Sequence, residues 1–309
     1  MEHFEDGRPI ATTQTGHRPG GTGENHGENR SLAHALTPKG EYLTDYTELK
    51  NKQRSTWALG DYDRVADGLT ISTDQTLRTA KIRPGERVLD LATGTGITAI
   101  AARERGAEIT GIDLTPELLA VARIKAESEG FDDVEFLEGD AEALPFGDAS
   151  FDVVLSTCGH MFAPDQPKVA TELARVTRPG GRVVFLAWTP DGGLGNYFRI
   201  MNKHVPPPAG VASPFNWGDP EKVRQLLGSA FCDMTFTRGD CPMFGASTTD
   251  VWELFSTQYG PTVRAIASLR GRALVAFRDE VLAYLDGYRA RDGKVRWGRE
   301  YLITRAVRA

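Results

Sequence analysis

The stretch from Val88 to Ala101, VLDLATGTGITAIA, constrains the fold of this 309-residue chain more than any other part. Its apolar start predicts a buried strand, Gly94 and Gly96 predict a tight loop, and the residues that follow repeat apolar side chains at helical spacing. Glycines tolerate positive φ and let a ligand approach the backbone, and a helix N-terminus offers unpaired N–H groups to an anion. The pattern predicts a site for a small anionic or zwitterionic ligand. A glycine turn that only joins a strand to a helix has the same short signature.

Strand and helix patterns alternate beyond this stretch. Runs of Val, Ile, Leu and Phe predict strands at residues 87–92, 108–114, 134–140, 151–157 and 182–188. Periodic apolar residues predict helices between them at residues 97–105, 116–130 and 165–176. This alternation predicts right-handed βαβ crossovers and a doubly wound, mostly parallel α/β sheet. Ligands on such sheets bind beyond the carboxyl ends of the strands.

The flanking segments carry other patterns. Residues 1–39 are rich in Gly, Thr, His and Asn with little to bury, which predicts a disordered tail. Helical periodicity covers residues 41–69, 71–82, 193–205, 220–227, 248–260 and 261–290. Residues 231–239 and 297–309 are patterned as two more strands, so seven are expected in all. After the tail, we predict an N-terminal helical lid, a ligand-binding core, covering helices with a sixth strand, and a final strand, at residues 40–82, 83–190, 191–296 and 297–309.

Composition excludes several classes of protein. The net charge of −6 argues against a broad nucleic-acid or anionic-membrane surface, because such a surface needs clustered Lys and Arg. No apolar run approaches the roughly 20 residues that span a bilayer, and the acidic start lacks the pattern of a secretory signal. We therefore expect a cytoplasmic chain. The three cysteines have no C-x-x-C spacing, which predicts neither a disulfide framework nor a metal site.

The glycine loop also fits a second class of ligand. The pattern Gly94-x-Gly96-x-x-Ala99, with Asp113 downstream, satisfies the fingerprint of dinucleotide-binding folds, so an NAD(P)-dependent oxidoreductase is one hypothesis. Asp90, however, lies four residues before Gly94, where its charge would oppose a pyrophosphate and suit an ammonium group. The loop also follows a whole helical segment, whereas dinucleotide folds often begin with it. These features favour a ligand with an ammonium group.

Five motifs, in this order, resemble the class I S-adenosylmethionine-dependent methyltransferases, in the branch that includes the ubiquinone and menaquinone methyltransferases. They are DLATGTG, GIDLTPELL, EGDAEALPF, FDVVLSTCGHMFAPD and RVTRPGGRVVF, and the resemblance covers residues 57–188. It implies a Rossmann-like sheet, S-adenosylmethionine as the cofactor, and an enzyme that transfers its methyl group to an acceptor. One departure is Ala92, which stands where the family has its first glycine and could tighten the turn.

The resemblance assigns the first part of the site to the loop after the first strand. Asp90 would face the α-ammonium group of the cofactor, directly or through water. The aminoacyl end would be held by the backbone of the loop, which contributes Ala92, Thr93, Gly94 and Gly96.

The ends of the next three strands supply the other implied contacts. Asp113 would accept hydrogen bonds from both ribose hydroxyls, and Leu114 would pack against the adenine. Asp140 and the backbone of Ala141 would read the adenine amino edge, and Thr157 would lie near the methionine portion. Ordinary turn and cap chemistry also places Asp at strand ends. The shared position of Asp113 and Asp140 at such ends favours binding, because sheets of this kind bind ligands there.

The acceptor is less well defined by sequence. His160, in CGHMF, is the best-placed titratable residue for a catalytic base, although a polar loop residue that orients a neighbour fits equally. Trp57 and Tyr62, beside Gly60, are predicted either to pack between helices or to cover the cofactor, with Tyr62 at its methionine end. We expect a small-molecule acceptor with an O, C, N or S nucleophile and no nucleic-acid partner. The sequence also fits a relative that binds the cofactor without transferring its methyl group. It does not specify the oligomeric state, and a homodimer is one option.

Overall fold

The computed structural model describes residues 34–36 and 42–309. Of the predicted tail it describes only β1 (His34–Leu36), which pairs antiparallel with β2 (Tyr42–Thr44); the rest of that prediction lies outside the described residues. The predicted helical start at residue 41 is wrong, because residues 42–44 pair as a strand and α1 (Thr47–Trp57) begins later. The Asp45 carboxylate accepts a hydrogen bond from the Thr47 backbone N–H at 2.9 Å, a local bond that favours a turn at this point.

Seven strands form one sheet in the order β5-β4-β3-β6-β7-β11-β8. The strands are β3 (Arg87–Leu91), β4 (Glu108–Asp113), β5 (Glu135–Glu138), β6 (Phe151–Thr157), β7 (Thr177–Trp188), β8 (Phe231–Asp240) and β11 (Glu300–Arg308). The first five run parallel, and β11 pairs antiparallel with both β7 and β8. The predicted seven-stranded, mostly parallel sheet is confirmed.

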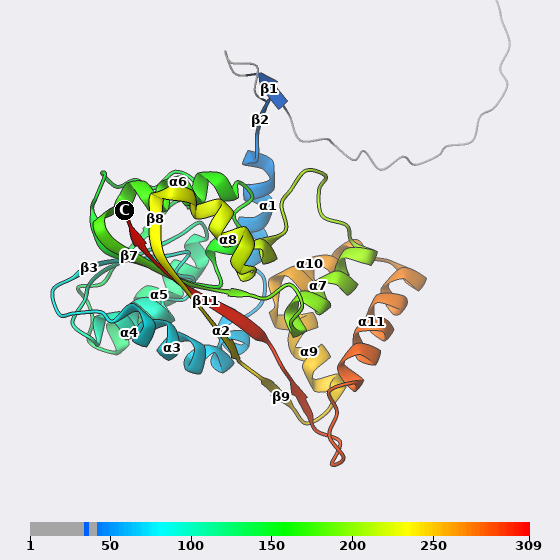
Figure 1. Ribbon diagram of the computed structural model, residues 1–309. Helices are drawn as coiled ribbons and strands as arrows, with labels where there is room; N and C mark the ends of the chain where they lie inside the picture. The colour runs from blue at the N-terminus through cyan, green and yellow to red at the C-terminus, as the bar shows by residue number, and fades with distance from the viewer. Residues whose placement is uncertain (1–33, 37–41) are drawn as a thin grey trace, which may run out of the picture. The chain divides into compact units, whose positions relative to one another are not determined.

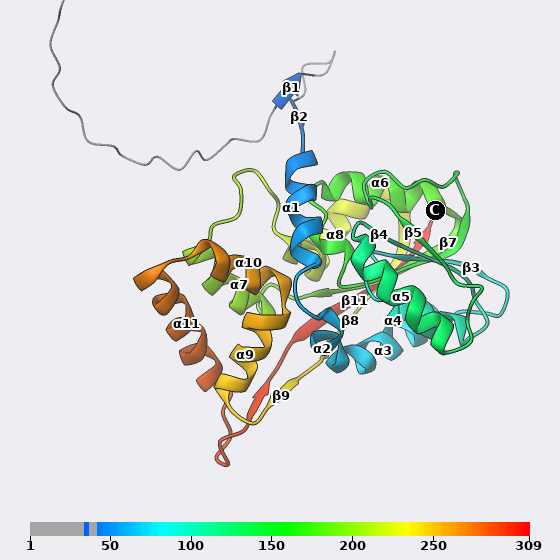
Figure 2. The ribbon, with the colours of Figure 1, turned by 180° about the vertical axis from the view of Figure 1, so that it is seen from behind.

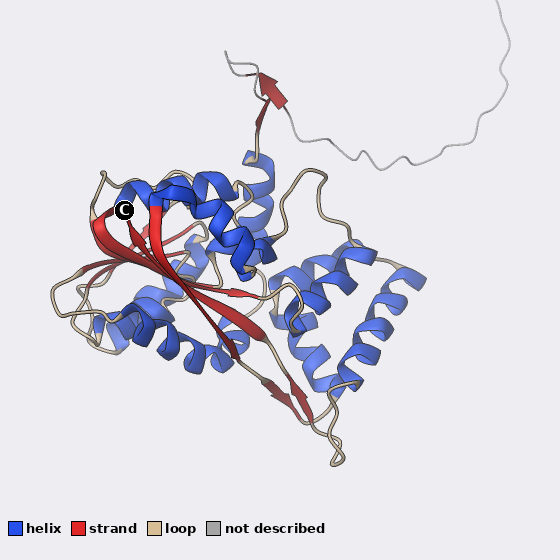
Figure 3. Cartoon of the chain, viewed as in Figure 1, coloured by secondary structure: helices blue, strands red, loops and turns tan. Residues whose placement is uncertain are grey.

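The direction of the strand order reverses between β3 and β6, which are neighbours in the sheet although β4 and β5 lie between them in the chain. The crossovers through α4 (Ile97–Arg103) and α5 (Pro116–Ser128) step one way, and the crossover through α6 (Gln166–Val176) steps the other way. Because such crossovers are right-handed, α4 and α5 cover one face and α6 covers the other. Figures 1 and 3 show helices on both sides of the sheet. The reversal leaves a crevice for ligands at the carboxyl ends of the strands.

The core lies where the parallel strands are covered on both faces. Val88, Leu89, Val153 and Leu155 of β3 and β6 are fully buried, as expected of apolar runs in a parallel sheet. Ahead of β3, α2 (Tyr62–Ala66) and a 3₁₀ turn lead into α3 (Thr70–Ala80), which packs on β6 and β7. On the other face, α8 (Pro220–Leu227) packs on α6 and β8.

A second group of helices follows β7. It comprises α7 (Gly193–His204), α9 (Thr248–Gln258), α10 (Gly260–Ser268) and α11 (Gly271–Asp286), with a short pair of strands, β9 (Met243–Gly245) and β10 (Val295–Trp297). Figure 2 shows this group beside α1 and α2, and α9 and α10 contact α2 and α1 respectively. Buried rings hold the group together, among them those of Phe255, Phe277 and Trp297.

Three predicted boundaries differ from the structure. The single helix predicted at 261–290 is two helices, because Leu269 and Arg270 have extended backbones and Gly271 takes a φ of 52°. The third strand ends at Glu138, before Asp140. The strand predicted at 182–188 begins earlier, at Thr177, and its register with β6 is irregular between residues 177 and 182. The spacing of apolar residues does not reveal these boundaries, because each one arises where the backbone leaves regular helix or strand geometry.

Candidate functional site

A cavity that is partly open to solvent lies at the carboxyl ends of the central strands. Ala92 follows β3, Asp113 and Leu114 come from the end of β4, and Thr157 ends β6; all four line the cavity. These residues are far apart in sequence and meet because parallel strands end at the same edge of a sheet. The cavity therefore occupies the crevice that the reversal of strand order creates.

The glycine loop and Asp113 form the first wall. Asp113 accepts hydrogen bonds from the backbone N–H groups of Gly94 at 2.9 Å and Thr115 at 2.8 Å. Burial raises the pKa of Asp113, and these backbone hydrogen bonds oppose that shift. A Cβ placed on Gly94, whose φ is 56°, would meet no atom within 4 Å, so the bare backbone faces open space. Such a loop can accept a ligand against its backbone.

Two residues with side chains take left-handed backbone conformations at the cavity. Ala92 has a φ of 55° and Cys158 a φ of 64°. A Cβ on Gly159 would lie 2.4 Å from the Ala92 Cβ and 2.5 Å from the Ala92 carbonyl oxygen. The methyl group of Ala92 is therefore accommodated because residue 159 has no side chain. Left-handed residues other than glycine cost free energy and cluster at functional sites.

Asp90 lies behind the lining of the cavity with only 1% of its surface exposed. Its Oδ2 accepts a hydrogen bond from the Thr93 hydroxyl at 2.6 Å, and its Oδ1 has no hydrogen-bond partner among the described residues. The pKa of Asp90 is raised to about 7, mainly by burial and also by the nearby charge of Asp113, while the Thr93 hydrogen bond opposes the shift. A cation beside the free oxygen would favour the ionised form of this carboxyl group.

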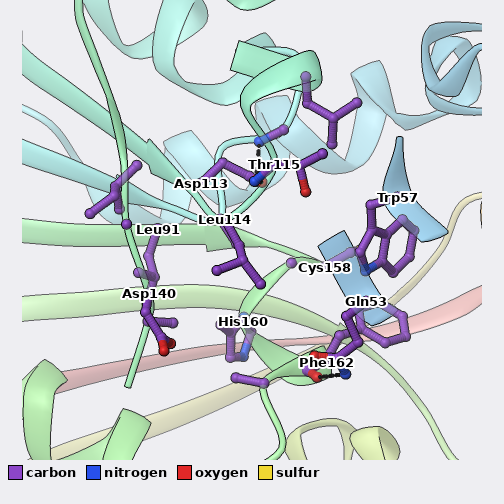
Figure 4. A pocket seen from close by; sticks show the side chains of 18 of the residues that line it. Gln53, Trp57, Leu91, Asp113, Leu114, Thr115, Asp140, Cys158, His160 and Phe162 are labelled. Atoms are coloured by element: carbon purple, nitrogen blue, oxygen red, sulfur yellow. Dashed lines mark hydrogen bonds between the residues drawn. The ribbon is translucent and has the colours of Figure 1, made fainter. Parts of the chain in front are cut away.

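The opposite wall comes from α1 and is held by polar contacts. Lys50 forms an ion pair with Asp140 at 2.6 Å and another with Glu142. Gln53 donates a hydrogen bond to the Phe162 carbonyl oxygen at 2.7 Å, which Figure 4 shows at the side of the cavity. None of the residues of α1, all of which the structure describes, is fully buried. Over Lys50 and Gln53, helix α1 is therefore held at the cavity by charge and hydrogen bonds rather than by fully buried side chains.

Aromatic rings close the cavity between α1 and α2. Trp57, Tyr62 and Phe162 line it, and the Trp57 ring makes edge contacts with both others at centroid distances of 5.8 and 4.8 Å. The centroid of the Trp57 ring also lies 6.0 Å from that of the Tyr259 ring, and Tyr259 is the residue before α10. The N-terminal helices and the later helical group therefore meet at this ring.

His160 lines the cavity but is 1% exposed, packed against the rings of Phe185 and Trp217. The Ser156 hydroxyl donates its proton to the Leu91 carbonyl oxygen at 2.7 Å, so the contact of 3.0 Å between His160 Nδ1 and Ser156 Oγ requires the proton on Nδ1. Nε2 has no partner in the described part of the chain. Burial lowers the pKa of His160 to about 3, so the ring is neutral near pH 7 and is a weak proton acceptor.

Comparison with known proteins supports one family. A family model described as a methyltransferase domain matches residues 89–185. An uncharacterized protein of Mycobacterium tuberculosis is 38% identical over 272 residues, which cover 84% of this chain and 98% of that protein. The demethylmenaquinone methyltransferase of Deinococcus radiodurans is 36% identical over 188 residues, which cover 54% of this chain and 78% of that enzyme. The chain belongs to the class I S-adenosylmethionine-dependent methyltransferases.

A solved structure agrees with this methyltransferase in fold. The YcgJ protein from Bacillus subtilis superimposes with a TM-score of 0.55 at 21% identity, over 77% of this chain and 97% of that protein. The cofactor of the methyltransferase is S-adenosylmethionine. The cavity and its surroundings have features suited to it: open space in front of Gly94, carboxylates at two strand ends, and, behind the lining, an Asp90 oxygen with no partner among the described residues. No helix of the described chain is long and apolar enough to cross a membrane.

The structure brings most of the predicted site residues of this methyltransferase to one cavity. Those that line it are Tyr62, Ala92, Gly94, Asp113, Leu114, Asp140, Ala141, Thr157 and His160. Asp90, Thr93 and Gly96 lie outside the lining. A Cβ on Gly96 would lie 2.9 Å from the Ala122 Cβ and 3.1 Å from the Phe136 ring, so this glycine permits close packing of the loop against α5 and β5.

Sequence reasoning missed several residues that line the cavity, among them Lys50, Gln53, Gly159 and Phe162. Lys50 and Gln53 belong to an amphipathic helix whose pattern does not show which polar residues meet the core. Gly159, next to His160 in CGHMF, lines the cavity and makes room for Ala92. The replacement of the family glycine by Ala92 was a signal that another residue must supply the space.

Proposed function

We propose that this methyltransferase transfers a methyl group to a small organic nucleophile. The observation that carries the proposal is that Asp113 and Asp140, from the ends of neighbouring strands, face one cavity together with the open backbone of Gly94. A small acceptor is favoured because side chains of α1 and α2, among them Trp57 and Tyr62, form one wall of the cavity and limit the space open to a macromolecule. We assign residues 83–190 to holding the cofactor and residues 40–82 and 191–296 to covering it.

The proposed contacts follow the chemistry of each wall. Asp113 binds the two ribose hydroxyls, for which a carboxylate with two oxygens is suited. Leu114 packs on the adenine, and Asp140 with the backbone of Ala141 binds its amino edge. Thr157, whose hydroxyl accepts a hydrogen bond from Thr98 at 3.0 Å, lies beside the methionine portion.

The aminoacyl end is assigned to the loop after β3. The backbone at Ala92, Thr93 and Gly94 holds the carboxylate, with Gly96 supporting the turn. Asp90 stabilises the ammonium group from behind the lining. Its raised pKa and its Oδ1, for which the described residues offer no hydrogen-bond partner, support this role. An ammonium group nearby would return the pKa of Asp90 toward its usual range.

When bound, S-adenosylmethionine supplies an electrophilic methyl group, which the lone pair of the acceptor takes by in-line displacement as the carbon–sulfur bond breaks. The protein contributes by holding the acceptor in line and by excluding water. Trp57, Tyr62 and Phe162 provide that apolar enclosure. His160 is proposed to act as a neutral hydrogen-bonding group, because its lowered pKa disfavours proton abstraction.

We expect S-adenosylmethionine and S-adenosylhomocysteine to bind at least tenfold more tightly than NAD or NADP. Asp90 suits the ammonium group of the first two ligands and would repel the pyrophosphate of the others. Isothermal titration calorimetry with each ligand checks this expectation. Tight NAD binding without a signal from either sulfur ligand would instead support the oxidoreductase hypothesis. Binding with no S-adenosylhomocysteine formed from any of a panel of nucleophiles would favour a relative that does not transfer methyl groups.

The polar contacts of α1 predict a lid that responds to the cofactor. Saturating S-adenosylhomocysteine should slow hydrogen exchange of residues 47–65 in the wild-type protein. Lys50→Met should reduce that protection and weaken S-adenosylhomocysteine binding about tenfold, because hydrogen bonds between charged groups at the lid are lost. Lys52→Met is the matched control, since Lys52 lies on the same helix and pairs at the surface with Glu48 at 3.0 Å. Exchange that is unaffected by the ligand, or equal effects of both substitutions, would contradict the lid.

A further inference from the structure

The end of α1 meets the junction between α9 and α10 with backbone against backbone, and Figure 2 shows α10 beside α1. A Cβ on Gly260, the first residue of α10, would lie 2.1 Å from the Thr56 carbonyl oxygen. A Cβ on Gly60, whose φ is 76°, would lie 2.5 Å from the Gln258 carbonyl oxygen. The Gln258 side chain also accepts a hydrogen bond from the Asp61 backbone N–H at 2.8 Å. Two glycines from distant parts of the chain therefore let these segments approach more closely than any side chain would allow.

One arginine of α10 binds the last turns of α1. The Arg264 Nε donates a hydrogen bond to the Thr56 hydroxyl at 3.1 Å. Its Nη2 donates to the Ser55 hydroxyl and, at 3.4 Å, to the Lys52 carbonyl oxygen. Unpaired carbonyl oxygens gather at the C-terminal end of a helix, where a positive charge is stabilising. Arg264 therefore caps α1 from a helix that is more than 200 positions away, since 208 positions separate it from Thr56.

Helix α1 depends on such outside contacts. It has eleven residues, and none of them is fully buried. Isolated helices shorter than about 12–15 residues are marginal in water, so contacts with the rest of the protein must keep α1 ordered. One set of these contacts joins Lys50 and Gln53 to the core side of the cofactor cavity. The other set is the joint with α10, and we expect the loss of either to loosen the helix.

Trp57 carries the position of this joint into the cofactor cavity. It is the last residue of α1, follows Thr56 directly, and lines the cavity. Its ring contacts that of Tyr62, which lines the same cavity, and that of Tyr259, which precedes Gly260. A displacement of α10 relative to α1 therefore changes the contacts of a side chain that forms part of the cavity wall.

We propose that Gly260 and Arg264 are positioning residues for the cofactor. They act through α1, which they hold in place as a wall of the cavity, so cofactor binding and the order of α10 are coupled. The role toward the cofactor rests on the proposed function, whereas the dependence of α1 on α10 does not. Coupling between sites is reciprocal, so a molecule that fixes the later helices would also tighten cofactor binding.

Hydrogen exchange of the full-length wild-type protein, with and without saturating S-adenosylhomocysteine, tests the coupling. The ligand should slow exchange of residues 260–268 together with residues 47–57, although no residue of α10 lines the cofactor cavity. Strand β8, at the edge of the sheet beyond β11, is the reference for a general stabilisation and should respond much less.

Variants assign the effect to the joint. Gly260→Ala places a methyl group where the Thr56 carbonyl oxygen lies, and Arg264→Met removes the guanidinium at an exposed position. In the ligand-free protein, both should speed exchange of residues 47–57 about fivefold, while exchange of β3 stays within about twofold. Both should also remove the protection of residues 260–268 by S-adenosylhomocysteine and weaken its binding about threefold to tenfold.

Conservative and control variants separate positioning from a general loss of structure. Arg264→Lys keeps the charge with fewer donors in a fixed geometry, so it should restore part of the protection. Arg278→Met is the matched control for the arginine, since Arg278 lies on α11 and pairs with its neighbour Asp279 at 2.9 Å. Gly147→Ala is the control for the glycine, and both controls should behave like the wild type. If Gly260→Ala does not fold, Arg264→Met and Arg264→Lys decide the question.

Two results would overturn the inference. Protection of residues 47–57 without protection of residues 260–268 in the wild-type complex would show that α1 responds to the ligand alone. Unchanged exchange of α1 in both ligand-free variants would show that α10 does not hold it. A wild-type protein that does not bind S-adenosylhomocysteine would contradict the proposed function instead, and the ligand-free comparison would still decide whether α10 positions α1.

Discussion

Asp113→Ala is expected to weaken binding of S-adenosylmethionine by about 2–4 kcal/mol, which is a loss of roughly 30- to 700-fold in affinity. Two charge-assisted hydrogen bonds to the ribose would disappear. The structure adds a second cause, because Asp113 also accepts the backbone N–H groups of Gly94 and Thr115. Without that carboxylate, the glycine loop loses one of the bonds that fix it against the end of β4.

Calorimetric titration and thermal unfolding of Asp113→Ala check this prediction. Asp113→Asn keeps the shape of the side chain but replaces one acceptor oxygen by a donor, so we expect an intermediate loss. Asp132→Ala, at an exposed position after α5, is the matched control and should bind like the wild type. Wild-type affinity in a folded Asp113→Ala protein would show that the ribose is not bound by this carboxylate.

Gly159→Ala is expected to lower both stability and cofactor affinity. The new methyl group would lie 2.4 Å from the Ala92 Cβ and 2.5 Å from the Ala92 carbonyl oxygen, so the loop after β3 must shift. Overpacking of this kind costs about 1–3 kcal/mol. Because Ala92 and Cys158 already hold left-handed conformations at this point, a shift would change the lining of the cavity, and we expect affinity to fall by more than tenfold.

A double variant separates the two clashes. Ala92→Gly combined with Gly159→Ala removes the contact between the methyl groups but keeps the contact with the carbonyl oxygen, so it should recover part of the loss. Gly147→Ala is the control, since its Cβ would meet the Ser150 hydroxyl at 3.6 Å, an ordinary contact. Melting temperatures and calorimetric titrations with S-adenosylmethionine are compared for the wild type, Gly159→Ala, the double variant and Gly147→Ala. A Gly159→Ala protein with unchanged melting temperature and affinity would mean that the loop has more room than the structure shows.

Local patterns were enough to predict the arrangement of the binding core. The strand from Arg87 to Leu91, the glycine loop and α4 are each encoded within about ten residues by apolar periodicity and by glycines that allow positive φ. The alternation of strands and helices then fixes the sheet class, because right-handed crossovers leave few topologies. From that class it follows that Asp113 and Asp140 lie at the same edge, and the structure places both at one cavity.

Properties that depend on distant partners were not predictable in this way. The sequence around His160 indicates a titratable loop residue, but only the packing of Phe185 and Trp217 against its ring gives it a lowered pKa. Likewise, no local pattern shows that Lys50 pairs with Asp140, which is 90 positions away. Burial and ion pairing are set by the segments that fold against a residue, and a single sequence does not state which those are.

The sequence by itself thus determined the seven-stranded sheet, the glycine loop and the acidic strand ends, because each arises from propensities that act over short distances. Tertiary structure alone decided that Gly159 makes space for Ala92, that Lys50 of α1 pairs with Asp140, and that Arg299 lines a small apolar cavity. The physical reason is the same in all three cases. Steric fit, charge pairing and desolvation are properties of groups brought together by the fold, and their free energies exist only once that fold has formed.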